Sequence, residues 1–280
     1  RLPPRSTLFP YTTLFRSAGA NLTKDIADAA GSLQRTTVAV ARESVRSVPM
    51  MLSRMGQIQA DTQISLGKLM SENTKRGGDK ELFLFENRVL THRQVNTRIN
   101  NVVAGLIHCG IRPGTPIGVL METRPSALVV VAALSRLGAV AVMLSPDADL
   151  GEMLRVTHCA AVVTDPDNLE AARSGCDPVL VLGGGSGQSR RIAGADGTSV
   201  VDMEQIEPSA VEIPKWYRPD PGVAGDVAFI LFTRSGGKLN PWRVTNHRFA
   251  MSAFGAASAA ALTDRDLHVD FLLEVVSRRV

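Results

Sequence analysis

The chain has 280 residues, enough for one large domain with an appended segment, and its hydrophobic content of 44% can supply a buried core. Aromatic residues make up only 5%, which argues against a protein that binds RNA or single-stranded DNA by stacking on bases. Three cysteines without a C-x-x-C spacing favour a reducing, cytoplasmic compartment. No uninterrupted apolar run reaches transmembrane length, so no membrane-spanning segment is expected.

The sequence patterns at the two ends differ from the pattern in the rest of the chain. Thr7 to Ser17 reads TLFPYTTLFRS, which resembles the in-frame translation of a sequencing-adapter oligonucleotide, so we interpret residues 1–17 as an artefact. They carry three arginines and no acid, and the formal net charge of +4 becomes +1 without them. Charge is then no argument for a nucleic-acid partner. Residues 267–280 do not continue the pattern before them, and we interpret the chain as a gene fragment with an uncertain tail.

Residues 18–78 are predicted to form an amphipathic helical appendage. Apolar side chains recur at steps of three and four from Val38 to Leu69. The stripe within residues 36–70 is expected to pack on its own domain or to contact a neighbouring one. An alternative is a basic amphipathic segment resting on anionic lipid, which would make the protein membrane-peripheral. The sequence KRGGD at residues 75–79 is interpreted as the boundary to the next domain.

From residue 79 to 266 the pattern alternates between strands and helices. Strands are predicted at 82–85, 88–90, 117–121, 139–144, 161–164, 179–182 and 227–232, and helices at 92–109, 126–137, 150–157 and 168–174. Thr91 and Gln94 form a capping box that opens the first of these helices, and Gly110 ends it. Repeated βαβ units predict an α/β fold with a mainly parallel sheet flanked by helices.

The stretch DVAFILFTRSGGKLNPWRVTNHRFAM, residues 226–251, reads as a buried strand, a phosphate-type loop, a second strand and a helix start. The candidate phosphate-binding residues are Thr233, Ser235, Gly236, Gly237 and Lys238, which offer hydroxyls, unhindered backbone amides and a positive charge. A Walker A loop requires G-x-x-x-x-G-K-[ST] running into a helix. The residues after Lys238 are LNP, which argues against an ordinary P-loop nucleotidase.

This stretch resembles the adenylate-forming superfamily, which comprises acyl-CoA synthetases, peptide-synthetase adenylation domains and luciferases. Its motif is Y-T-S-G-T-T-G-x-P-K-G-x-x-x-T-H, and Thr233 and His247 fall at the motif's spacing. RSGGK replaces S-G-T-T-G, and the motif lysine has no counterpart. The sequence ENRVLTHRQVNTRINNVVAGLIHCGIRPGTPIGVLMETRPSALVVVAALSRLGAVAVMLSPD is similar to the same family's opening block, so the resemblance covers about residues 81–266. RVTNHRF is similar to the fatty-acid-transport branch.

The resemblance implies a two-step reaction. A fatty acid or other carboxylate reacts with ATP to give an acyl-adenylate, and coenzyme A then displaces AMP, with Mg²⁺ assisting at the phosphates. The family's adenine-binding, ribose-binding and catalytic lysine motifs fall downstream of Val280, so we assign no catalytic residue and expect the chain to be inactive by itself. The alternative is a non-catalytic relative, or a module of a fused lipid-metabolism protein, that keeps the fold without ATP chemistry.

The other motifs in the sequence do not predict a functional site. GGGSG at residues 183–187 follows a strand but precedes no helix pattern, which favours a flexible loop over a dinucleotide site. A dinucleotide-binding oxidoreductase would also need glycines after the first parallel strand, where METRPSAL has none. His108 with Cys109, and His158 with Cys159, lack further ligands at metal-site spacing, so no metal site is expected. His247 is expected to cap or buttress the helix below the loop.

Overall fold

The computed structural model describes residues 58–85, 87–146, 148–183 and 199–259. The chain divides into two compact units, Arg1–Ser53 and Arg54–Val280, and the described residues all belong to the second. Predictions for residues 1–57, for most of the glycine run at 183–187 and for residues 260–280 lie outside the described residues.

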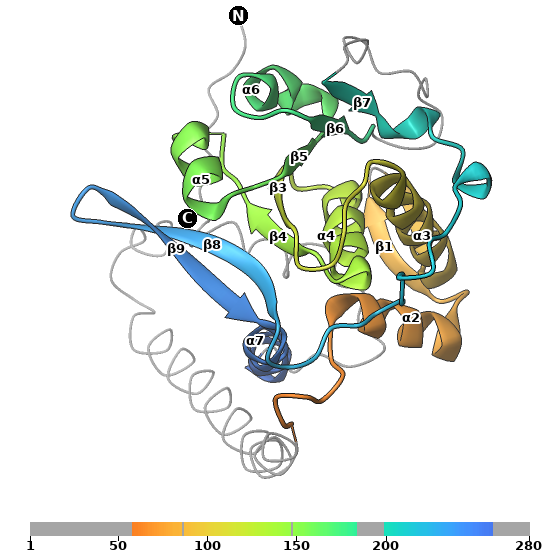
Figure 1. The fold of residues 1–280 in the computed structure, drawn as a ribbon. Helices are drawn as coiled ribbons and strands as arrows, with labels where there is room; N and C mark the ends of the chain where they lie inside the picture. Colours follow the sequence, from red (N-terminus) through yellow and green to blue (C-terminus); the bar gives the residue numbers. More distant parts are fainter. Residues whose placement is uncertain (1–57, 86, 147, 184–198, 260–280) are drawn as a thin grey trace, which may run out of the picture. The chain divides into compact units, whose positions relative to one another are not determined.

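The described residues form a seven-stranded sheet in the order β7-β6-β5-β3-β4-β8-β9 (Figure 1). Its strands are β3 (Pro116–Leu120), β4 (Val140–Met143), β5 (Ala161–Thr164), β6 (Val179–Val181), β7 (Val200–Asp202), β8 (Val227–Ser235) and β9 (Lys238–Thr245). Every neighbouring pair is parallel except β8 and β9. The predicted mainly parallel α/β sheet is therefore confirmed.

Helices cover both faces of this sheet. One face carries α3 (His92–His108) and α4 (Pro125–Leu137), and the other carries α5 (Leu150–Thr157) and α6 (Leu169–Arg173) (Figure 1). Side chains alternate between the two faces along a strand, so each face of the sheet has its own hydrophobic core. Ile117 and Val119 of β3 pack with α3 and α4, whereas Leu120 packs with α5 and α6. The last helix, α7 (Asn246–Ala259), packs against β8 through Phe249 and Phe229, whose ring centroids are 4.7 Å apart.

Local signals in the sequence account for several element boundaries. Thr91 Oγ1 accepts a hydrogen bond from the Gln94 amide, and the Gln94 side chain accepts one from the Thr91 amide, so the predicted capping box is present. Before it, β1 (Glu81–Phe85) and β2 (Arg88–Thr91) form the predicted antiparallel hairpin. The sequence did not predict β7 or the short 3₁₀ helices η2 (Pro166–Asn168), η3 (Met203–Gln205) and η4 (Pro208–Ala210).

Residues 58–78 are the described part of the predicted appendage, and they contain helix α2 (Leu66–Gly77). It begins after Ser65, whose hydroxyl accepts a hydrogen bond from the Lys68 amide, and residues 58–65 are not helical. Within the described residues of the appendage, the predicted helix is therefore present only from Leu66 onward. Leu66 and Met70 are buried in the core formed with α3 and α4, whereas Leu69 is 50% exposed. None of the helices in the described ranges has the length and hydropathy needed to span a bilayer.

Candidate phosphate-binding hairpin

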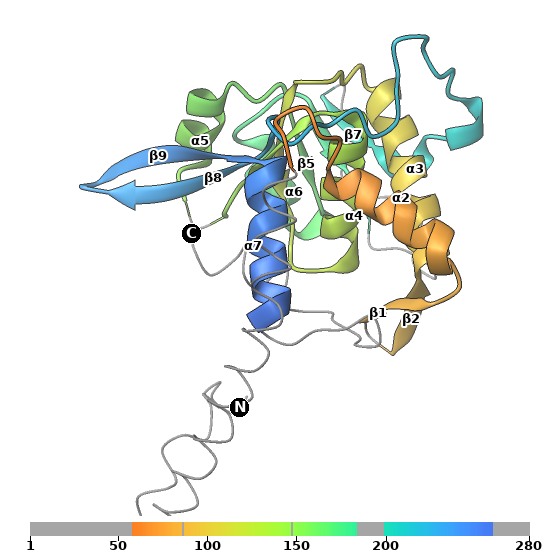
Figure 2. The same ribbon diagram turned by 90° about the horizontal axis from the view of Figure 1, so that it is seen from below.

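Strands β8 and β9 form a hairpin that projects from the sheet (Figures 1 and 2). Ser235 pairs with Lys238, so only Gly236 and Gly237 lie between the strands, with φ angles of +58° and +77°. A two-residue turn with two positive φ angles is of type I′, whose twist matches that of the flanking strands. The loop predicted from Thr233 to Lys238 is therefore shortened: Thr233 and Ser235 belong to β8, and Lys238 begins β9.

The strand register places three of the predicted residues on one face. Cross-strand partners in an antiparallel pair share a face, and alternate residues of a strand do too. Ser235 pairs with Lys238 and Thr233 with Asn240, so the two hydroxyls, the ammonium group and an amide side chain lie together. All four side chains are exposed. The opposite face holds Ile230 and Phe232, which are buried against Met153 of α5.

The hairpin and the start of α7 carry only positive formal charge. Residues 227–259 contain no aspartate or glutamate. Four exposed cations lie in this stretch: Arg234, Lys238, Arg243 and Arg248. In the part of the chain that the structure describes, none of them forms an ion pair. Arg234 and Arg243 pair with Leu239 and Ile230 and so lie on the opposite face. Lys238 and Arg248 lie on the face of Trp242, which is therefore suited to an anion rather than to a cationic ligand.

Trp242 is a residue of this face that the sequence reasoning missed. It pairs with Leu231, so it shares the face of Lys238 and Asn240, and it is 50% exposed. The guanidinium carbon of Arg248, from α7, lies 5.0 Å from the centre of the indole ring. The alternation Lys238, Asn240, Trp242 was visible in the sequence. It could be assigned to a face only after the turn residues were known.

The hairpin lies where ligands commonly bind in open α/β sheets. β8 runs parallel to β4, and it continues from Ile230, its last partner in β4, to Ser235, beyond the carboxyl edge of the sheet. The chain leaves β4 toward β5 and leaves β8 toward β9, in opposite directions across the sheet. Such a change of direction is a topological switch point, and the crevice at its carboxyl edge is the usual ligand site.

A second switch point, between β3 and β5, is closed by internal interactions. Asp165 follows β5 and is fully buried. It accepts hydrogen bonds from the Glu122 amide at 2.7 Å and from Asn168 Nδ2 at 2.9 Å. Arg124 donates to Asp167 at 2.6 Å. These groups already satisfy one another, so this crevice is a weaker candidate for a ligand than the hairpin.

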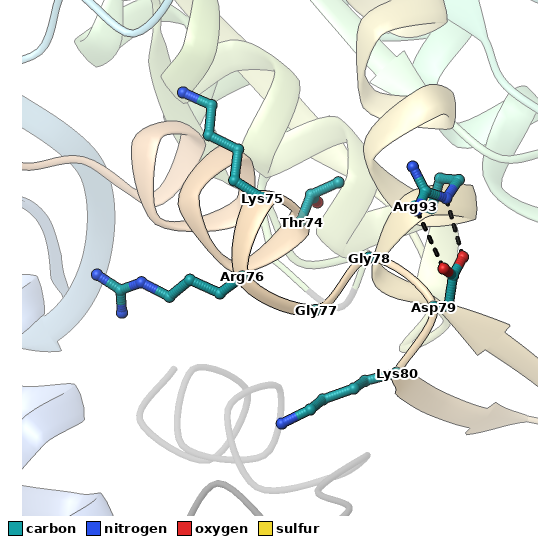
Figure 3. Close-up of a pocket in the computed structure, with 8 residues that line it drawn as sticks. All are labelled: Thr74, Lys75, Arg76, Gly77, Gly78, Asp79, Lys80 and Arg93. Atoms are coloured by element: carbon teal, nitrogen blue, oxygen red, sulfur yellow. Dashed lines mark hydrogen bonds and ion pairs between the residues drawn. The ribbon is translucent and has the colours of Figure 1, made fainter.

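A cavity of about 630 Å³ lies at the carboxyl end of α2, between this helix and the start of α3. Figure 3 shows that Lys75, Arg76 and Lys80 at this cavity point in different directions, while Arg93 donates to both carboxylate oxygens of Asp79 at 2.9 and 3.1 Å. Lys75 and Arg76 lie in the last turn of α2, where cations stabilise the helix dipole. The helix end therefore explains Lys75 and Arg76, and the ion pair with Asp79 explains Arg93.

The remaining candidate residues form no second site. No group of three or more His, Cys, Asp and Glu side chains in the described ranges could hold a metal ion. The three cysteines are free thiols, and burial raises the pKa of each, which disfavours the reactive thiolate: Cys109, Cys159 and Cys176. His247 is the second residue of α7, and its amide donates to the Ala224 carbonyl at 3.0 Å.

Comparison with known proteins identifies the family. The model of the AMP-binding enzyme family matches residues 70–236. The medium/long-chain-fatty-acid–CoA ligase FadD6 of Mycobacterium tuberculosis is 28% identical over 200 residues, which cover 70% of this chain and 32% of that protein. The chain thus spans about a third of the length of this relative.

Solved structures share the fold. A protein from Rhodopseudomonas palustris assigned as a long-chain-fatty-acid CoA ligase aligns with a TM-score of 0.57 at 16% identity, over 73% of this chain and 50% of that one. The anthranilate CoA ligase AuaEII, solved with anthranoyl-AMP, aligns with a TM-score of 0.53 at 18% identity, over 71% of this chain and 38% of that one. The resemblance stated from the sequence is confirmed, and the chain belongs to the AMP-binding enzyme family.

Proposed function

We propose that this chain holds the phosphates of ATP in an enzyme that converts a fatty acid into its acyl-adenylate and then into an acyl-CoA. Membership of the AMP-binding enzyme family supports the adenylation step. The similarity to a medium/long-chain-fatty-acid–CoA ligase supports a fatty acid as the carboxylate and coenzyme A as the acceptor. Both steps are proposals for the whole enzyme, and the role proposed for this chain is binding of the triphosphate.

In the first step a carboxylate oxygen attacks the α-phosphorus of ATP, and the bond to the β-phosphate bridging oxygen breaks. Pyrophosphate leaves with the bonding electrons, so negative charge grows on the β- and γ-phosphate oxygens. Donors that are already in place stabilise such charge without reorganising. Here they are the Lys238 ammonium group, the hydroxyls of Thr233 and Ser235, and the Gly236 and Gly237 amides, which a two-residue turn leaves outside its closing hydrogen bond.

The observation that carries this proposal is the shared face of Thr233, Ser235 and Lys238. Three donors from two strands converge at the carboxyl edge of the sheet, and residues 227–259 contain no acid to repel an anion. The described residues do not fit a resident Mg²⁺ ion, because they contain no cluster of metal ligands and the hairpin has no carboxylate. No step proposed for these residues passes through a metal.

Two further features belong to the proposal. The three free thiols agree with a reducing cytoplasm as the location of the enzyme. The apolar stripe at residues 36–70 is proposed to contact a neighbouring domain. Only residues 58–70 of that stripe are described, and α2 within them packs on its own sheet domain.

A non-catalytic relative is the alternative, and the hairpin also provides its supporting observation. The turn has only two residues, so few backbone amides can surround a phosphate chain. In the register of the family motif, slid by one residue, Trp242 stands at the position of the lysine. A protein with this geometry could keep the fold and serve as an interaction module.

Binding of ATP separates the two proposals. Isothermal titration should show that the chain binds ATP and that Lys238→Ala weakens binding about tenfold or more, because a hydrogen bond to a charged group contributes roughly 1.5–3 kcal/mol. Lys80→Ala removes an exposed lysine outside the hairpin and is the matched control. Pyrophosphate exchange with medium- and long-chain fatty acids, measured on the full-length parent protein, tests turnover. A folded chain that does not bind ATP, together with a parent protein that does not exchange pyrophosphate, would support the non-catalytic alternative.

A further inference from the structure

Two of the three cysteines, Cys159 and Cys176, occupy equivalent positions before neighbouring parallel strands. Val162 of β5 pairs with Val179 of β6, and each cysteine lies three residues before its own strand's member of this pair. The pairing extends back toward the cysteines, because the Val162 amide donates to the Pro178 carbonyl at 3.2 Å. Neighbouring strands are about 4.8 Å apart, so this register places the two cysteines opposite each other.

The helices that lead into these strands bring both cysteines to the same face of the sheet. α5 and α6 cover that face (Figure 1), and both cysteines pack against the hydrophobic core beneath them. The Cys159 amide donates to the Leu154 carbonyl of α5 at 3.2 Å, and the Cys176 amide donates to the Ala172 carbonyl of α6 at 3.2 Å. A Cβ atom added at Gly175 would lie 3.1 Å from Leu154 Cδ1, so the end of α6 closely approaches α5.

The two thiols also interact with each other electrostatically. Burial raises the pKa of Cys159, a hydrogen bond with Thr157 partly offsets this, and the nearby Cys176 thiol raises the pKa further, because two thiolates would repel each other. Both side chains are only partly buried, so a small solute can reach them. A disulfide needs a Cα separation of about 4.4–6.8 Å, and the spacing of adjacent strands falls within that range.

We propose that Cys159 and Cys176 form a dithiol site that hydrogen peroxide oxidises to an intramolecular disulfide. One thiolate attacks a peroxide oxygen and the O–O bond breaks, which gives a sulfenic acid and a hydroxide that takes the thiol's proton to become water. The second thiol attacks the sulfenic sulfur, the S–O bond breaks, and a second water leaves. The pair of thiols thus loses two electrons and two protons, and the peroxide gains them.

This site is reduced until peroxide accumulates. Burial raises the pKa of both thiols, so little thiolate is present at neutral pH and the first attack is slow. The disulfide would tie the end of α5 to the end of α6, across 17 positions of the chain. The inference concerns the face of α5 and α6 and does not depend on ATP binding at the hairpin.

The test treats the reduced chain with hydrogen peroxide and counts its thiols after denaturation. The number of thiols should fall from three to one per chain, and dithiothreitol should restore all three. Trypsin cleaves after Arg173, which separates the two cysteines. Mass spectrometry without reduction should therefore find the Cys159 peptide joined to the Cys176 peptide with the loss of two hydrogen atoms. A non-reducing gel should show no disulfide-linked dimer.

Cys109 provides the matched control, because it follows α3 and packs against the core on the opposite face of the sheet. Cys109→Ser should still form the disulfide and retain no free thiol after oxidation. Cys159→Ser and Cys176→Ser should each form no intramolecular disulfide. The melting temperature of each variant checks that it is folded, and the peptide mapping of the unchanged chain needs no variant.

Three results would overturn the proposal. Retention of three thiols after prolonged peroxide treatment would show that the pair does not react. Oxygen added to Cys159 or Cys176 that dithiothreitol does not remove would show that the two sulfurs are too far apart to bond. A disulfide that includes Cys109, or one that joins two chains, would show that the pairing inferred from the register of β5 and β6 is wrong.

Discussion

Arg136 and Asp220, which are 84 positions apart in the chain, meet in a buried ion pair with Nε and Oδ1 3.4 Å apart. Arg136 is 2% exposed. Its guanidinium also donates to Asn100 Oδ1 at 2.6 Å, to the Gly67 carbonyl at 3.0 Å and to Ser71 Oγ at 2.5 Å. One cation thereby joins α2, α3 and α4 to the segment that leads into β8 and the hairpin.

Replacing this arginine should destabilise the whole domain. Arg136→Ala leaves the Asp220 carboxylate with a single side-chain donor, Ser71, and leaves the Asn100 and Gly67 oxygens without their donor. Breaking a buried pair in this way typically costs about 3–5 kcal/mol of unfolding free energy, measured by urea denaturation. The matched control is Arg76→Ala, because Arg76 is exposed on α2 and pairs with Glu72 at 3.9 Å. The control should change stability by less than about 0.5 kcal/mol, and equal effects of the two variants would refute the role given to Arg136.

Gly67 allows α2 to approach α4 closely. A Cβ atom at this position would lie 2.7 Å from the Arg136 amide nitrogen and 2.8 Å from its Cα, and the backbone of α4 cannot move aside as a side chain would. Gly67→Ala should therefore lower the unfolding free energy by about 1–3 kcal/mol. Gly151→Ala in α5 is the control, because its nearest contact is a side-chain oxygen at 3.4 Å. That substitution should be neutral or stabilising by up to about 1 kcal/mol. An unchanged unfolding free energy for Gly67→Ala would show that α2 does not approach the backbone of α4 this closely.

The sequence was most informative where a strong local pattern has explicit ends. Helix α5 and strand β5 have the predicted bounds, since Asp149 caps the helix and four consecutive buried residues, AVVT, precede Asp165. Strand β7 was missed because it has only two consecutive apolar residues, Val200 and Val201, whereas the equally short β6 lies in an apolar run of four, residues 179–182. Such a strand depends on pairing with β6.

Prediction of the site was limited by tertiary geometry. The residue types at the hairpin were recognised from the sequence, yet two glycines fit a flexible loop as well as a type I′ turn. The register that places Trp242 on the same face as Lys238 follows only from the turn. Arg248 reaches Trp242 from the following helix, and no strand pattern predicts that contact.

Stability should depend on pH through His92. Burial lowers the pKa of His92 below its ordinary value of 6.5, with Lys80 contributing, and its Nδ1 is buried without a hydrogen-bond partner in the described structure. The folded state therefore keeps the imidazole neutral at a pH where the unfolded chain already binds a proton. The unfolded state binds more protons below about pH 6.5, so stability falls as the pH drops through that value.

The measurement is the unfolding free energy in urea at pH 7.5 and at pH 5. His92→Gln should lose less stability than the unchanged chain between the two values, because glutamine does not titrate. Lys80→Ala removes the charge that disfavours His92 protonation, so it should also reduce the pH dependence. An identical pH dependence in all three proteins would rule out His92 as the titrating group.

The turn should tolerate asparagine at its first glycine but not a β-branched residue at its second. Nothing lies within 4 Å of a Cβ atom added at Gly236 or Gly237, so any effect must come from their positive φ angles. Gly236→Asn should preserve the hairpin, because Asn-Gly is a preferred type I′ sequence. Gly237→Val places a β-branched residue at φ +77° and should weaken the hairpin by about 1–2 kcal/mol. Hydrogen exchange of the amides in residues 231–242 measures this directly, with faster exchange expected for Gly237→Val alone. Unchanged exchange in that variant would mean that the segment is an open loop, in which Thr233, Ser235 and Lys238 are not held on one face.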